Sequence, residues 1–255
     1  MSKVLYEELI PQEFTVRLAQ CPIAYLPLGT LEYHGEHLPL GADGLQAKGF
    51  FINLAQKLGG IVMPMLFLGP EFSTIVDGEL LTGVDTWTGE CLYNGELKVN
   101  VPGKKLREPG KFPGSAYWIS DEGFNVIMEA TLAQIARAGF KILVTHGHGP
   151  SRIIVQKKRD EWSKKYGLAI FTCKGEHDAG FGVMTDHAAF NETSLTLALR
   201  PDLVKMERLP KDRNDWPLGV VGRDPRDASA STGAQIIEHE TQRMIRILQA
   251  ALDGL

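Results

Sequence analysis

Short apolar runs alternate along the chain with segments whose apolar positions repeat at helical spacing. The first apolar run, residues 23–28, has the length of a buried strand, and residues 43–58 have the periodicity of a helix that ends at Gly59-Gly60. A second apolar run at residues 61–68 predicts a second strand. The first quarter of the chain therefore predicts the order strand, helix, strand.

The same alternation resumes after residue 119. The pattern predicts helices at residues 120–139, 151–166, 192–199 and 231–252, and strands at residues 142–145 and 168–173. Strands and helices that alternate in this way are typical of an α/β fold with a largely parallel sheet and helices on both faces. Because no linker, repeat or low-complexity tract interrupts the pattern, we expect residues 1–255 to form a single domain.

Residues 69–119 break the alternation. They are rich in Gly, Pro and Thr and contain short alternating runs, such as Leu97-Lys98-Val99-Asn100-Val101, that are typical of a hairpin. A stretch of this length without helices is uncommon unless it has a function. We therefore expect this excursion to lie near the mouth of a site or at a contact between subunits.

Composition and charge exclude several classes of protein. Hydrophobic residues make up 44% of the chain and charged residues 23%, which is ordinary for a soluble globular protein. The net charge of −4 gives no electrostatic reason to bind nucleic acid or an anionic membrane. No signal peptide and no membrane-spanning run of about 20 apolar residues is present, and the three cysteines form no C-x-x-C pair. These features predict a cytoplasmic protein that binds neither nucleic acid nor a membrane.

The densest group of reactive side chains follows the first predicted strand. Residues 27–43 carry Glu32, His34, Glu36, His37 and Asp43, together with three glycines that allow the chain to bend. Glu32 and His34 are two positions apart, so they leave an extended backbone on the same face. Carboxylates and an imidazole that converge at one point suit a divalent metal of the zinc or manganese type. The alternative is a charged surface loop.

Other histidines also follow predicted strands. His146-Gly147-His148-Gly149 comes at the end of the strand at 142–145, and Glu176-His177-Asp178 comes shortly after the strand at 168–173. The segment from Asp186-His187 to Glu192-Thr-Ser leads into the helix at 192–199. Sites in open parallel sheets lie beyond the carboxyl ends of the strands. We therefore expect these segments to meet residues 27–43 at one site.

Together these segments resemble the creatininase (creatinine amidohydrolase) family. That family carries Glu-x-His-Gly-x-His-Leu-Pro-x-x-x-Asp, an Asn-Gly-His turn after a strand, and His-(Ala/Gly)-Gly-x-x-Glu-Thr-Ser. The corresponding segments here are Glu32-Tyr-His34-Gly-Glu-His37-Leu-Pro-Leu-Gly-Ala-Asp43, His146-Gly147-His148, and His187-Ala-Ala-Phe-Asn-Glu192-Thr-Ser. Pro113-Gly114 and Gly222-Arg-Asp-Pro225 also match, so the likeness extends over nearly the whole chain.

The resemblance implies a site with two divalent metal ions, zinc or alternatively manganese or iron. Glu32 and His148 would bind one ion, His34 and Glu192 the other, and Asp43 would bridge them. Two such ions lower the pKa of a shared water near to neutrality. His187 would be the general acid/base that transfers a proton to the leaving nitrogen; the alternative is a histidine that is simply buried and hydrogen-bonded. The family also implies a homo-oligomer, a hexamer in its known members.

Several positions depart from the family pattern. Gly149 and Pro150 stand where creatininases have an aromatic and then an acidic residue, and His146 replaces the usual Asn, either orienting a ligand or acting as an extra one. Ala189 replaces a glycine, and Phe190 stands where many relatives carry an acid. We therefore expect hydrolysis of a C–N bond in a small-molecule amide or cyclic amide other than creatinine. The alternatives are a two-metal phosphoesterase and a non-catalytic metal-binding scaffold.

Two further groups are interpreted as structural. We expect His37 to fix its loop rather than to bind metal, because three ligands already crowd that segment. The basic residues between 152 and 165 are mixed with acids along one helix, which indicates a solvated face rather than a binding patch. They are Arg152, Lys157, Lys158, Arg159, Lys164 and Lys165.

Overall fold

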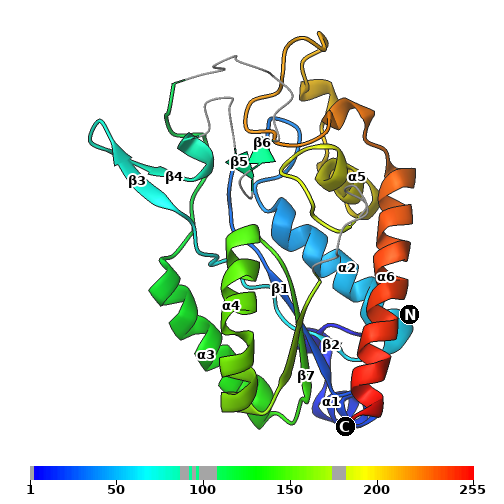
Figure 1. The fold of residues 1–255 in the computed structure, drawn as a ribbon. Coiled ribbons are helices and arrows are strands. Elements are labelled where there is room, and N and C mark those ends of the chain that lie inside the picture. The colour runs from blue at the N-terminus through cyan, green and yellow to red at the C-terminus, as the bar shows by residue number, and fades with distance from the viewer. Residues whose placement is uncertain (1–2, 87–91, 94–95, 98–107, 174–181) are drawn as a thin grey trace.

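A four-stranded parallel sheet lies at the centre of the computed structural model, which describes residues 3–86, 92–93, 96–97, 108–173 and 182–255 (Figure 1). Its strands, in spatial order, are β2 (Ile61–Val62), β1 (Ile23–Leu28), β7 (Ile142–Gly147) and β8 (Ala169–Thr172). The two central strands, β1 and β7, pair over six residues, from Ile23 opposite Ile142 to Leu28 opposite Gly147. Strands β1, β2 and β7 are buried throughout and β8 in part, which explains why they appear in the sequence as short apolar runs.

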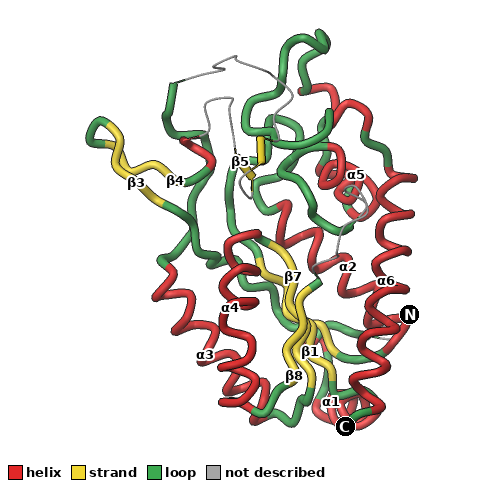
Figure 2. The backbone as a smooth tube through the Cα atoms, in the orientation of Figure 1, coloured by secondary structure: helices red, strands yellow, loops and turns green. Residues whose placement is uncertain are grey.

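Helices cover both faces of this sheet (Figure 2). The helices are α1 (Pro11–Gln20), α2 (Ala42–Leu58), α3 (Asp121–Arg137), α4 (Gly149–Tyr166), α5 (Phe190–Leu199) and α6 (Ala230–Asp253). Alternate residues of β1 point to opposite faces. Ile23 and Tyr25 pack with α2, α5 and α6, whereas Ala24 and Leu26 pack with α3, α4 and the partly buried side of α1. The predicted α/β fold with helices on both faces is confirmed.

Some boundaries differ from the sequence prediction. The strand predicted at residues 61–68 is regular only over Ile61–Val62, and the segment returns to β1 at a single bridge between Leu28 and Leu66. Helix α4 begins at Gly149 rather than at Ser151, since Pro150 is favourable in a first helical turn. Helix α1 was not predicted. Its signal is the proline at its first position and the Glu13 side chain, which accepts a hydrogen bond from the Ile10 N–H.

The excursion at residues 69–119 contains antiparallel hairpins. Strands β3 (Ser73–Val76) and β4 (Glu79–Thr82) pair across an Asp77-Gly78 turn in which both residues have positive φ, and the hairpin stands away from the sheet (Figure 1). Strands β5 (Leu92–Tyr93) and β6 (Glu96–Leu97) form a second short pair, and the rest of the alternating run at 97–101 lies outside the described residues. Short 3₁₀ helices are η1 (Tyr6–Glu8), η2 (Val84–Thr86), η3 (Pro201–Leu203), η4 (Met206–Arg208) and η5 (Pro225–Asp227). Among the described residues, no helix is long and apolar enough to cross a membrane.

The carboxyl ends of β1 and β7 approach each other closely. Gly147 has a φ of +135°, and a Cβ atom at this position would lie 1.6 Å from the Leu28 carbonyl oxygen. Only glycine fits here, because any side chain would clash with the backbone of β1. The next residue, His148, donates its backbone N–H to Leu28 at 3.1 Å. This close contact holds the first residue after β7 directly beside the loop that follows β1.

Candidate metal centre

Five side chains that the sequence singles out as metal ligands meet at the carboxyl ends of β1 and β7. Glu32 and His34 come from the loop after β1, Asp43 from the first turn of α2, His148 from the end of β7, and Glu192 from the first turn of α5. All five residues are less than 10% exposed. Buried carboxylates and imidazoles need partners, and these five have one another.

Asp43 lies between two histidines. Its Oδ1 atom is 3.3 Å from Nε2 of His34, and its Oδ2 atom is 2.9 Å from Nδ1 of His148. Glu32 Oε1 lies 3.2 Å from the same His148 nitrogen, and Glu192 Oε2 lies 3.7 Å from the same His34 nitrogen. The carboxylate of Asp43 therefore has one oxygen facing each of two neighbouring groups of ligand atoms.

Backbone carbonyls fix the orientation of the histidine rings. His34 uses Nδ1 to contact the carbonyl of Glu32 at 3.1 Å, which leaves Nε2 facing the carboxylates. His148 uses Nε2 to contact the carbonyl of Pro70 at 2.9 Å, which leaves Nδ1 facing them. A carbonyl only accepts hydrogen bonds, so in each neutral ring the nitrogen that contacts it carries the proton, and the inward nitrogen can offer its lone pair to a metal ion. Metal-binding histidines are usually held in this way.

The donor atoms group into three sets that could each hold an ion, and within each set they lie within 4.8 Å of one another. The sets are Glu32, Asp43 and His148; His34, Asp43 and Glu192; and Glu32, His34 and His187. The first two share Asp43 and divide the five ligands in the way that the family resemblance implies. Mixed nitrogen and oxygen donors of this kind fit zinc, manganese or iron.

Electrostatics favour a cation at this centre. Burial alone would lower the pKa of His34, but Asp43 and the other carboxylates raise it to about 10. Burial likewise opposes protonation of His148, yet Glu32 and Asp43 raise its pKa well above the usual value. Burial and the charge of Asp43 raise the pKa of Glu192. The centre thus takes up protons to offset its excess negative charge, and divalent cations would offset the same charge.

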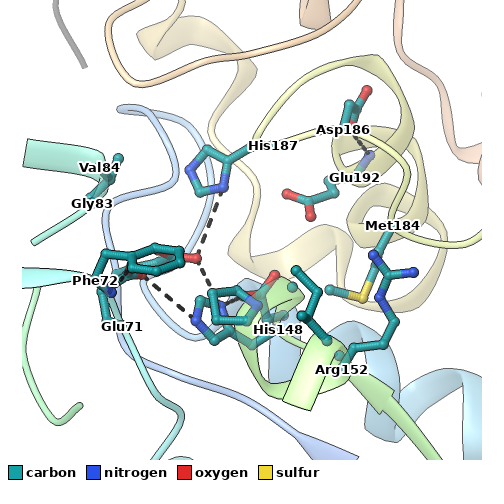
Figure 3. Close-up of a pocket in the computed structure, with 16 residues that line it drawn as sticks. Glu71, Phe72, Gly83, Val84, His148, Arg152, Met184, Asp186, His187 and Glu192 are labelled. Atoms are coloured by element: carbon teal, nitrogen blue, oxygen red, sulfur yellow. Dashed lines mark hydrogen bonds and ion pairs between the residues drawn. The ribbon is translucent and has the colours of Figure 1, made fainter. Parts of the chain in front are cut away.

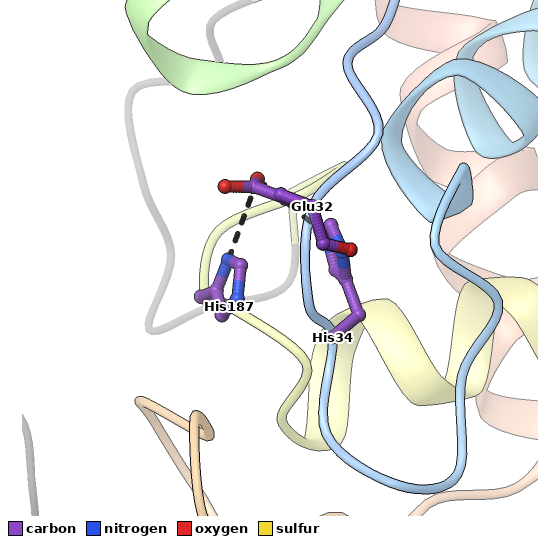
Figure 4. A group of neighbouring side chains, drawn as sticks. All are labelled: Glu32, His34 and His187. Carbon is purple, nitrogen blue, oxygen red and sulfur yellow. Dashed lines mark hydrogen bonds and ion pairs between the residues drawn. The ribbon is translucent and has the colours of Figure 1, made fainter. Parts of the chain in front are cut away.

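His187 lies at the rim of the same centre, where its ring stacks on that of His34 with centroids 4.4 Å apart. The backbone of His187 exchanges two hydrogen bonds with Val221, and its Nε2 contacts the Tyr33 carbonyl at 3.0 Å. Its Nδ1 is turned toward Glu32 and lies 3.9 Å from Oε1 (Figure 4). Burial and the neighbouring His34 lower the pKa of His187 to about 4, so the ring is neutral at pH 7 with a lone pair facing the centre.

A cavity of about 270 Å³ opens onto these side chains (Figure 3). Glu32, Asp43, His148, His187 and Glu192 form its polar end. Its other walls come from the excursion at 69–119, from the first turns of α4 and from the segment before α5; they include Phe72, Val84, Ile153 and Met184. The expectation that the excursion lies near the mouth of the site is confirmed for its root, residues 71–72 and 83–84.

Comparison with known proteins agrees with this geometry. The family model described as "Creatininase: Creatinine amidohydrolase" matches residues 7–93 and 102–248 of the chain. The chain belongs to the creatininase family. A creatinine amidohydrolase from Pseudomonas putida is 28% identical, over 82% of this chain and 77% of that protein.

Solved creatininase structures share the fold. A crystal structure of creatinine amidohydrolase (creatininase) superposes with a TM-score of 0.70 at 21% identity, covering 98% of both chains. A putative creatinine amidohydrolase from Bacteroides fragilis superposes with a TM-score of 0.62 at 16% identity, covering 97% of this chain and 96% of that one. The creatininase fold thus extends over the whole length compared.

Three other histidines named in the sequence analysis differ in place and contacts. His37 is buried, and its Nε2 contacts Thr193 Oγ1 at 2.9 Å, so it ties its loop to α5 as expected. His146 points away from the metal centre into the core, where it packs edge-on against Phe50 and Phe51. It belongs to none of the three candidate ligand sets. His177 lies outside the described residues.

Two residues of this creatininase-family site were missed in the sequence. The side chain of Glu71 is 8% exposed and lies 3.7 Å from Nε2 of His148; burial and the charge of Glu32 raise its pKa to about 8. Arg152 lines the cavity one helical turn after His148, although the sequence placed it on a solvated face. Signals were present for both. Glu71 closely follows an apolar run, and Arg152 is four residues after a ligand, which is the spacing of one helix face.

Asp186 has a structural contact of its own. Its carboxylate accepts hydrogen bonds from the backbone N–H groups of Asn191 at 2.8 Å and of Glu192 at 3.0 Å. These are free N–H groups of the first turn of α5, so Asp186 acts as a cap for that helix. Because Glu192 sits in this turn, Asp186 helps to fix the direction in which the Glu192 carboxylate enters the centre.

Proposed function

We propose that this protein is a metal-dependent amidohydrolase that hydrolyses a C–N bond in a small-molecule amide or cyclic amide. The proposal rests on one observation above all: the two oxygens of Asp43 face the inward nitrogens of two different histidines, each anchored by a backbone carbonyl. A carboxylate in this position suits a bridge between two cations. Family membership supports the same class of reaction.

We assign the five ligands to two ions. Glu32 and His148 would hold one, His34 and Glu192 the other, with Asp43 shared between them, and the burial and charge of these groups support this division. When bound, two divalent cations lower the pKa of a water and polarise a carbonyl oxygen. Related solved structures are described as creatininase of the Zn-Zn type and as creatininase Mn, which makes zinc and manganese the first metals to test.

His187 is the residue that we propose moves the proton. Its Nε2 donates to the Tyr33 carbonyl, so the neutral ring has its lone pair at Nδ1, on the side of the centre. From there it would accept a proton from the attacking water and deliver it to the leaving nitrogen. The alternative in which His187 is only packed is disfavoured by the direction of Nδ1. A role as a ligand remains compatible with its set of Glu32 and His34.

The substrate is proposed to differ from creatinine. The positions after His148 are Gly149 and Pro150, both on the cavity wall, where the family pattern has an aromatic residue and an acid. Glu71 brings a carboxyl group to the same cavity from another segment. The groups that face the substrate are therefore rearranged, whereas the metal-binding groups keep the family pattern.

The non-catalytic scaffold is the second candidate, and an open cavity with His187 turned toward the centre argues against it. The two-metal phosphoesterase has a single cavity arginine in its favour among the described residues. A screen separates the three. Protein loaded with zinc or manganese is incubated with linear amides, cyclic amides and phosphomonoesters, and chelator-treated protein is the control. We expect metal-dependent release of amine; release of phosphate alone, or no turnover of any class, would reject the amidohydrolase.

We propose that residues 1–255 act as one domain in a cytoplasmic homo-oligomer, a hexamer if it follows the family. The β3–β4 hairpin supports a contact between copies, because Ile75 and Leu80 on it and Phe72 just before it are 71%, 50% and 75% exposed. Exposed apolar groups on an edge hairpin usually mark an interface. Light scattering of the purified protein would measure the number of subunits, and a monomer would reject this part of the proposal.

A further inference from the structure

Arg152 is the one lysine or arginine on the cavity wall among the described residues. It lies in the first turns of α4, where its backbone N–H donates to the His148 carbonyl at 3.0 Å. In Figure 3 its guanidinium lies beside Met184, on the side of the cavity opposite Phe72. A cation thus faces the same space as the candidate metal centre, but from a separate wall.

The guanidinium of Arg152 has no anionic partner in the described part of the chain. No carboxylate there lies within ion-pair distance of it. Further along α4, by contrast, Arg159 forms an ion pair with Asp160. The acids of the cavity have other contacts: Asp186 caps α5, and Glu71 accepts the Phe72 N–H at 2.8 Å. The guanidinium is half-buried and offers five hydrogen-bond donors to the cavity, so its position favours a bound anion.

We propose that Arg152 binds a carboxylate of the substrate, so that the amide hydrolysed by this enzyme is an acidic one. The inference rests on the proposed amidohydrolase function and adds the class of substrate. The carboxylate would lie on Arg152 while the amide carbonyl lies over the metal centre. His148 immediately precedes α4 and Arg152 lies one turn into it, so about 6 Å of helix rise separates the two residues along the axis.

The chemistry of the cavity favours a carboxylate over a phosphate. A single guanidinium forms two parallel hydrogen bonds with one carboxylate and matches its single charge. A phosphate dianion would leave a second charge uncompensated beside Glu71 and Asp186, two acids on the same cavity. The apolar side chains on the wall of the same cavity, Phe72, Ile153 and Met184, suit the carbon skeleton that joins a carboxylate to an amide.

The test compares matched probes on matched variants. The probes are hydantoin-5-acetic acid, its neutral carboxamide and inorganic phosphate, each titrated calorimetrically into zinc-loaded protein. The variants are Arg152→Met, which keeps length and removes charge, Arg152→Lys, and Arg159→Met as an exposed control on the same helix. We expect the wild type and Arg159→Met to bind the acid roughly 10- to 100-fold more tightly than the carboxamide, the range for a charged hydrogen-bonded pair.

Arg152→Met is expected to lose this preference while it keeps its zinc content and melting temperature, and Arg152→Lys should retain part of it. An unchanged preference in Arg152→Met, no binding of the acid to the wild type, or tighter binding of phosphate than of the acid would each overturn the proposal. A turnover assay distinguishes failure of the role of Arg152 from failure of the proposed amidohydrolase function. Charge-selective binding without hydrolysis of any amide would reject the amidohydrolase alone, whereas hydrolysis with no preference for acids would reject only the role of Arg152.

Discussion

Nδ1 of His148 lies 2.9 Å from Oδ2 of Asp43, although the two residues are 105 positions apart in the chain. The other oxygen of Asp43 lies 3.3 Å from Nε2 of His34, which belongs to the other set of candidate ligands. Asp43 therefore joins the loop after β1 to the end of β7 and divides the centre into two halves.

Removing the shared ligand Asp43 should lower the metal content of the protein more than removing an unshared ligand such as His34. In Asp43→Ala both ligand sets lose a carboxylate oxygen, whereas in His34→Ala only one set loses its imidazole. We expect a metal content near zero for the first variant and near one ion per chain for the second, measured by elemental analysis. His239→Ala, an exposed change on α6, is the control and should keep the wild-type content. Equal losses in Asp43→Ala and His34→Ala would show that Asp43 does not bridge.

Metal binding should release protons. Carboxylates outweigh the effect of burial and raise the pKa of His34 to about 10 and that of His148 well above its usual value, so they favour a proton on each inward nitrogen in the metal-free protein. A ring nitrogen must lose its proton before it can bind a cation, so affinity should rise with pH. Calorimetric titration of zinc into chelator-treated protein in two buffers of different ionisation enthalpy should reveal a net release of protons. A proton count of zero would contradict the assigned ring states.

The proton-transfer role of His187 has a kinetic signature. His187→Asn should keep both ions and the fold but lower kcat by roughly 10²- to 10⁴-fold on any amide that the wild type hydrolyses, because general acid–base catalysis contributes about this much. Added metal should not restore the rate. Melting temperature, metal content and kcat are measured on the same preparation. Near-normal kcat would remove His187 from the mechanism, and lost metal would make it a ligand with Glu32 and His34.

Buried His146 should make the protein sensitive to acid. Burial, with the charge of Arg152, lowers its pKa to about 3, whereas the unfolded chain has the ordinary value near 6.5. Between these values only the unfolded state binds the proton, so stability falls as pH drops through this window, by up to about 1.4 kcal/mol per pH unit. His146→Asn removes this term. Urea unfolding of chelator-treated protein from pH 4.5 to 7 should show a shallower pH dependence in the variant; identical slopes would contradict the assignment.

The sequence was sufficient for most of the sheet and for the ligand cluster. The strands β1 and β7 are buried on both faces, so their apolar runs stand out, and the ligands belong to short motifs that lie directly after them. The run at 61–68 misled because its apolar residues continue beyond Val62, whereas the regular pairing with β1 does not. Helix α1 buries no residue fully, so its apolar side was too weak to predict it.

The residues that were missed depend on contacts between distant segments. In the sequence Glu71 looks like an ordinary loop acid. In the structure it lies beside His148, 77 positions away, because the carbonyl of the preceding Pro70 accepts the His148 ring N–H. Arg152 belongs by composition to a basic helix surface, and only its place one turn after His148 directs it into the cavity. Patterns along a chain report burial and periodicity. They do not report which charged side chain of a helix faces an internal cavity.

The most direct test of the two-metal centre is a crystal structure of the protein loaded with zinc, with anomalous data collected on both sides of the zinc absorption edge. We predict two peaks per chain about 3–4 Å apart, the usual separation in two-metal sites. One should lie on Glu32 and His148, the other on His34 and Glu192, with an oxygen of Asp43 on each. A single peak, or two peaks with Asp43 bound to only one of them, would contradict the proposed centre.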